Sequence, residues 1–119
     1  MKVVIAGSRS IVNPMIIVEA IVESGFAITE VVSGGAQGVD SLAEKWATQN
    51  EIPVTIFSPD WKQFGRRAGP IRNSEMAGYA DALIAIWEGK SKGTKDMITK
   101  AEKAGLKVFV LTLRPDQVN

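Results

Sequence analysis

The stretch that decides the fold is Ser33-Gly34-Gly35-Ala36-Gln37-Gly38-Val39-Asp40. It follows the apolar pair Val31-Val32, which is typical of a buried strand, and precedes the periodic segment 41–50, which predicts a helix. A glycine-rich turn between a strand and a helix gathers backbone N–H groups at the positive end of the helix dipole. The stretch is therefore interpreted either as an anion-binding loop or as a tight turn without a ligand.

Apolar patterns on both sides of this stretch predict an alternation of strands and helices. Strands are expected at 3–6, 31–32, 53–57, 82–87 and 106–113, and helices at 14–24, 39–50, from Pro70 to about 80, and between Gly93 and Gly105. Segment 58–70 is predicted to be irregular, and a polar tail begins near residue 114. This order predicts one α/β domain over residues 1–119: a Rossmann-like three-layer fold with a mostly parallel sheet of about five strands and helices on both faces.

Three loops rich in glycine and small polar residues follow predicted strands. They are Gly7-Ser8-Arg9-Ser10, the 33–38 loop and the segment 88–94. Ligands of such folds bind beyond the carboxyl ends of the strands, near the switch in strand order. Because all three loops fall at that edge, we predict a composite binding site there.

Composition excludes several classes of chemistry. The 119 residues contain no cysteine and no histidine, which removes disulfides, thiolate nucleophiles, imidazole metal ligands and Ser-His-Asp catalysis. The 14 Lys and Arg residues nearly balance 13 Asp and Glu residues, so bulk electrostatics give no support for capture of DNA or of an acidic membrane. No apolar run approaches the roughly 20 residues that span a bilayer, and the N-terminus lacks a signal-peptide pattern. We therefore expect a cytoplasmic protein that uses no metal or cofactor.

A phosphate site would need backbone donors, hydroxyls and fixed charge. The glycine-rich loops supply N–H groups, Arg9 and Arg72 supply guanidinium groups, and Lys90 lies in a loop without the Gly-Lys-Thr order of a Walker A motif. The candidate ligand-binding residues are Gly7, Ser8, Arg9, Ser33, Gly34, Gly35, Ala36, Gln37, Gly38, Asp40, Arg72, Gly89, Ser91, Gly93 and Thr94. Trp61, Phe64 and Trp87 are candidates for stacking on a base. Asp40 is interpreted either as a carboxylate that complements the helix dipole or as one that faces the ligand.

The motifs together resemble the SLOG superfamily, and most closely its small YspA-related members. The resemblance rests on the 33–40 run, on Gly7-Ser8-Arg9 and on Arg72-Asn73 with the following segment 75–85 and Gly93-Thr94. It covers roughly residues 2–112 and implies a Rossmann-like domain that binds nucleotides or nucleotide-derived ligands, with Asn73 added to the site. It also implies a homo-oligomer.

Two better-known branches of the superfamily imply different functions. The lysine-decarboxylase-like phosphoribohydrolases cut the N-glycosidic bond of nucleoside monophosphates, and the resemblance places their catalytic Glu at Met97. Such a reaction here would use Arg72 with Asp96, Glu75 or Glu88. The DNA-processing protein A family has a motif similar to residues 33–40 and binds single-stranded DNA. Binding of a nucleotide is the function we expect, with hydrolysis and single-stranded nucleic-acid binding as alternatives, and no membrane partner.

Overall fold

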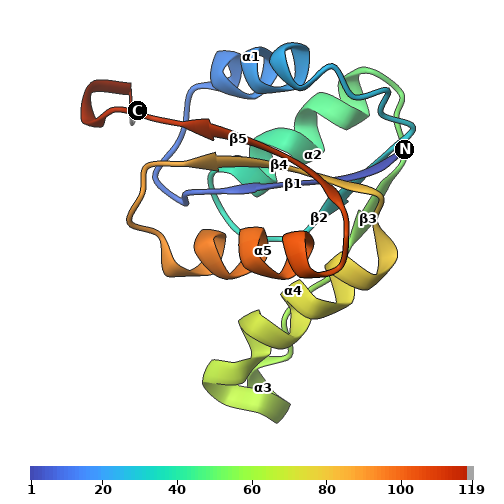
Figure 1. Ribbon diagram of the computed structural model, residues 1–119, viewed down its shortest axis with the longest axis vertical. Coiled ribbons are helices and arrows are strands. Elements are labelled where there is room, and N and C mark those ends of the chain that lie inside the picture. The colour runs from blue at the N-terminus through green and yellow to red at the C-terminus, as the bar shows by residue number, and fades with distance from the viewer. Residues whose placement is uncertain (118–119) are drawn as a thin grey trace.

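The computed structural model describes residues 1–117, and these form a parallel sheet covered by helices on both faces (Figure 1). The strands are β1 (Lys2–Gly7), β2 (Glu30–Ser33), β3 (Val54–Ile56), β4 (Ala82–Trp87) and β5 (Lys107–Thr112). Their order across the sheet is β3-β2-β1-β4-β5, and each neighbouring pair is parallel. The predicted Rossmann-like architecture is confirmed.

Helices α1 (Pro14–Ser24) and α2 (Val39–Gln49) cover one face, and α4 (Ala68–Tyr79) and α5 (Lys92–Lys103) cover the other (Figure 1). Alternate side chains of each strand point to opposite faces, so Val3 and Ile5 pack under α1 and α2. Val4 and Leu83 pack instead against the helices of the second face. All four of these side chains are fully buried, which explains why the central strands read as continuous apolar runs.

The ends of α1 are set by residues with clear capping chemistry. The side chain of Asn13 accepts a hydrogen bond from the Met15 N–H at 3.0 Å, and Pro14 occupies the first turn, where its missing N–H costs nothing. Gly25 ends the helix in the left-handed region at φ 68°. Local sequence therefore fixes both ends of α1.

Segment 58–70 was predicted to be irregular, but the structure shows that it is largely helical. It contains α3 (Trp61–Phe64), a 3-10 turn (Gly65–Arg67) and the first residues of α4. Asp60 caps α3 by accepting from the Gln63 N–H at 3.1 Å. Helix α4 begins at Ala68, so Pro70 lies within its first turn rather than at its start. A proline is tolerated there because the N–H groups of a first turn have no helical partner.

The strand order reverses between β1 and β4. From β1 the chain winds outward through β2 to β3, and it then returns along α4 to place β4 on the other side of β1. The loops that leave β1 and β4 therefore diverge at the carboxyl edge and leave a crevice there. No helix within residues 1–117 is long and apolar enough to cross a membrane.

Candidate binding site at the carboxyl edge of the sheet

A cavity of about 460 Å³ opens at this switch point. Its wall combines the loop after β1, the glycine-rich loop before α2, one side of α4 and the first turns of α5. The lining residues are Ala6, Gly7, Ser8, Arg9, Ser10, Ala36, Asp40, Arg72, Asn73, Met76, Ser91, Gly93, Thr94 and Met97. The structure thus brings the three predicted loops to one cavity.

Two glycines of the 33–38 loop allow neighbouring segments to approach its backbone closely. A Cβ on Gly34 would overlap the Arg72 guanidinium and lie 2.9 Å from an Asp40 carboxylate oxygen. A Cβ on Gly38 would overlap the backbone of Ser8 and Arg9, and the Val39 N–H donates to the Ser8 carbonyl at 3.2 Å. The loops after β1 and β2 are therefore in direct backbone contact at Gly38, which only glycine permits at this position.

Arg72 is the half-buried cation of the cavity. Its Nε donates to Asn73 Oδ1 at 3.0 Å, and its Nη1 donates to the Gly34 carbonyl. Burial lowers the pKa of Arg72, the charge of Asp40 opposes that shift, and the nearby charge of Arg9 lowers the pKa further. Within the described part of the chain Arg72 forms no salt bridge, although the Asp40 charge favours its charged form more strongly than the Arg9 charge opposes it.

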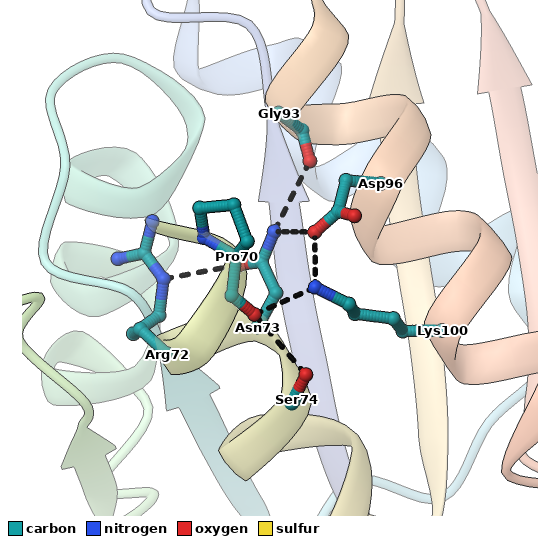
Figure 2. Close-up of polar contacts among 7 residues, drawn as sticks. All are labelled: Pro70, Arg72, Asn73, Ser74, Gly93, Asp96 and Lys100. Carbon is teal, nitrogen blue, oxygen red and sulfur yellow. Dashed lines mark hydrogen bonds and ion pairs between the residues drawn. The ribbon is translucent and has the colours of Figure 1, made fainter. Parts of the chain in front are cut away.

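Asn73 connects Arg72 to the start of α5 (Figure 2). Its buried amide donates to Asp96 Oδ2 at 2.9 Å and to the Gly93 carbonyl at 3.3 Å. Lys100 Nζ lies 2.9 Å from the same Asp96 oxygen. These contacts hold α4 against α5, and they fix Arg72 and the N-terminus of α5 relative to each other.

Asp40 is a buried carboxyl group in the cavity wall. It is 5% exposed, and its Oδ2 accepts from the Ala36 N–H at 3.2 Å. Burial raises the pKa of Asp40 to about 6, although the Ala36 N–H and the Arg72 charge act in the opposite direction. Asp40 therefore orders the glycine-rich loop and also faces the cavity.

We expect this raised pKa to give a pH-dependent stability. Between about pH 4 and pH 6 the folded state holds a proton that the unfolded chain has released, so the free energy of unfolding falls as pH rises. By pH 7 this cost reaches about 3 kcal/mol. From pH 4 to pH 7, urea denaturation should show the free energy of unfolding of the wild type falling relative to that of Asp40→Asn. Glu30 and Glu88, whose lowered pKa values act in the opposite direction, are common to both proteins and cancel in this difference. Asp116→Asn, at an exposed site, should follow the wild type, and parallel pH profiles of the wild type and Asp40→Asn would contradict the prediction.

Several predicted site residues do not line this cavity. Among residues 1–117, its wall includes none of the carboxylates Glu75, Glu88 and Asp96. Glu75 is exposed on α4, Glu88 accepts from the Ser91 N–H at 3.0 Å, and Asp96 is engaged by Asn73 and Lys100. The wall also lacks Ser33, Gly34, Gly35, Gln37, Gly38 and Gly89. Of these, Ser33 is fully buried and donates to Glu44 at 2.6 Å.

Sequence reasoning missed the apolar floor of the cavity. Ala6, Met76 and Met97 line it, and both methionines are at most 2% exposed. Both methionines also belong to the hydrophobic core under α4 and α5. Met97 nevertheless had a signal, because the resemblance to phosphoribohydrolases places a catalytic Glu at that position.

A second hollow of about 410 Å³ adjoins the cavity. It lies between the glycine-rich loop and α3, and Arg9, Ala36 and Arg72 line both spaces. Its other lining residues are Gly34, Gly35, Gln37, Ser58, Pro59 and Trp61. Gln37 and Trp61, which the sequence analysis named as candidate site residues, therefore both line this hollow.

Residues 1–64, more than half of the chain, match the family described as "YspA, cpYpsA-related SLOG family". One relative is the Gene 61 protein of Mycobacterium phage D29, which is 40% identical over 85 residues, or 66% of this chain and 68% of that protein. The X-ray structure of DNA processing protein A (DprA) from Streptococcus pneumoniae matches 98% of this chain with a TM-score of 0.77 at 21% identity. The chain spans about half of that protein, 52% of its length, and the likeness is one of fold.

Proposed function

This chain belongs to the YspA- and cpYpsA-related SLOG family, and we propose that its cavity binds a nucleotide or nucleotide-derived ligand through a phosphate group. Membership of the family indicates a role related to nucleotides or nucleic acids. The cavity volume of about 460 Å³ lies in the range of small-molecule sites. The proposal names a ligand class for this particular cavity.

The observation that carries the proposal is the pairing of Arg9 and Arg72 at one cavity. Arg72 is half-buried and held by Asn73 and Gly34, and the charge of Arg9 is close enough to lower its pKa. Arg9 adds a second positive charge to the cavity beside Arg72, and an anion between the two guanidinium groups would be attracted by both. A phosphate suits this place because guanidinium groups recognise its oxygens in a bidentate way.

Two helix N-termini support the same ligand. Helices α2 and α5, of 11 and 12 residues, both begin at the cavity, and Gly38 gives α2 no side-chain cap. Their dipoles favour negative charge at this edge of the sheet. At α5 the Thr94 N–H is already bound by Ser91 Oγ, so the preceding N–H groups of Lys92 and Gly93 are the ones available to a phosphate.

A thermal-shift series tests this proposal. AMP, ADP, ADP-ribose and cyclic AMP are compared with adenosine, which has the same base and sugar but no phosphate. A ligand at one hundred times its Kd stabilises the folded state by about 2.7 kcal/mol, which corresponds to a Tm rise of several degrees for a chain of this size. We expect a rise with at least one of the phosphates and none with adenosine. Equal shifts with adenosine and AMP would contradict a phosphate-centred site.

The same samples separate binding from hydrolysis. A phosphoribohydrolase would release free adenine from AMP, which chromatography detects after incubation. Within residues 1–117, Asp40 is the carboxylate that lines the cavity, and it is already engaged by the Ala36 N–H. We therefore propose binding rather than cleavage, and accumulation of free adenine that disappears in Asp40→Asn would reverse that order.

Single-stranded nucleic acid is the second candidate ligand. Arg66 and Arg67 are exposed in the 3-10 turn that follows α3. The net charge of +1 supplies little long-range attraction, so affinity would depend on this local group of cations. A steep loss of oligonucleotide affinity with rising salt would favour this candidate over a mononucleotide.

A further inference from the structure

We propose that the second hollow holds a nucleobase stacked on Trp61, so that the full ligand contains two nucleoside units joined through phosphate. This inference rests on the proposed function, because it places the joining phosphate between Arg9 and Arg72. The first nucleoside would occupy the cavity at the switch point, and the second would occupy the hollow beside α3.

The two spaces share part of their wall, which includes both arginines. Arg9, Ala36 and Arg72 line both of them, and their volumes are similar, about 460 Å³ and 410 Å³. Each volume falls within the range of a site for one small organic molecule. A phosphate at the shared wall would therefore have room for a nucleoside on either side.

Trp61 has the exposure of a stacking residue rather than of a core residue. Its side chain is 52% exposed, among the largest apolar exposures of the described chain. A Cβ on Gly69 would lie 3.6 Å from Cη2 of the indole, so the far edge of the ring lies near the start of α4. Stacking of a base on such a ring is favourable for every base, because each one presents a π-face.

The rest of the hollow suits the edge of a base. Gln37 and Ser58 offer an amide and a hydroxyl, which can donate and accept hydrogen bonds. None of the described residues that line the hollow is Asp or Glu, whereas two are Arg. Its charge therefore matches a ligand that carries phosphate.

Isothermal titration with AMP and with the 5′-phosphorylated dinucleotide of adenosine tests the proposal. We expect the wild type to bind the dinucleotide more tightly than AMP. Trp61→Ala should weaken dinucleotide binding by about 5- to 150-fold, the range for loss of one stacked base, and should leave AMP binding unchanged. Trp61→Phe keeps an aromatic face and should retain most of the affinity.

The outcomes distinguish this proposal from the one on which it rests. If the wild type binds neither ligand, the two-unit site fails, and phosphate binding is decided by the thermal-shift series with ADP, ADP-ribose and cyclic AMP. If it binds both equally, or if Trp61→Ala weakens both equally or neither, the two-unit site fails and phosphate binding stands. Trp61→Phe keeps an aromatic ring at this position, so affinity that is retained in Trp61→Phe and lost in Trp61→Ala is attributed to the ring.

The affinity for a ten-residue adenosine oligonucleotide shows whether the two units belong to a dinucleotide or to a longer nucleic-acid strand. Affinity equal to that of the dinucleotide indicates a ligand that ends at two units, and much higher affinity indicates a single-stranded nucleic acid. Stacking should also quench the fluorescence of Trp61. The dinucleotide should therefore quench the wild type strongly and Trp61→Phe weakly, whereas equal quenching in both would contradict contact with Trp61.

Discussion

Gly38→Ala should destabilise the folded protein by about 3 kcal/mol or more. Gly38 has φ 73° and ψ −125°, a region of the backbone that is essentially restricted to glycine. A Cβ there would also overlap the backbone of Ser8 and Arg9. Because these neighbours are backbone atoms, relief requires the loop after β1 to move as a unit.

Urea denaturation at pH 7 measures this loss, and Gly78→Ala is the matched control. Gly78 lies in α4, has no atom within 4 Å of an added Cβ and does not have positive φ. Alanine in place of an exposed helical glycine should stabilise by up to about 1 kcal/mol. The two glycine substitutions should therefore have opposite signs. A loss below about 1 kcal/mol in Gly38→Ala would show that the two loops separate easily.

Arg72→Gln should reduce affinity for the tightest nucleotide found by thermal shift by about 10- to 150-fold. This range corresponds to a hydrogen bond to a charged group, about 1.5–3 kcal/mol. Arg72 is held in place by Asn73 and Gly34, so little of its binding energy is spent on ordering the side chain. Isothermal titration gives the loss directly.

Lys107→Gln controls for the change in net charge. Lys107 begins β5 at the amino edge of the sheet, away from the cavity, and its loss lowers the charge by the same amount. It should leave affinity within about 2-fold of the wild type, because exposed charges beyond about 10 Å are screened. Arg9→Gln, at an exposed position that lines the cavity, should weaken binding without disturbing the contacts of Arg72. Equal affinities in Arg72→Gln, Arg9→Gln and Lys107→Gln would contradict a role of the two arginines in binding.

Much of the fold was predictable because its signals are local. The apolar run 82–87 appears unchanged as β4, and Asn13, Pro14 and Gly25 bound α1 as their chemistry requires. The segment 58–70 was misread because its glycines, prolines and charges are typical of loops. Its short helix depends on Asp60 and Gln63, and this Asp-x-x-Gln spacing was the signal available for it.

The site was predictable in outline but not in detail. Strand ends and parallel topology were enough to bring three loops to one edge, but they say nothing about which way a side chain turns there. Ser33 turns to Glu44 and Asp96 turns to Asn73, and both arrangements depend on helix packing across many residues. The adjoining hollow was also beyond sequence, because it requires α3 to be a helix that holds Trp61 beside the glycine-rich loop.

The backbone contact between Gly38 and Ser8 has a further consequence for recognition. Loops that bind ligands are often the least protected parts of a protein and close around a ligand only after it arrives. Here the Ser8 N–H donates to the Ile86 carbonyl and the Val39 N–H donates to the Ser8 carbonyl. The loop after β1 is therefore hydrogen-bonded to both β4 and α2. The binding site is therefore preformed, and a ligand is selected by its fit to this shape rather than by the closure of a loop.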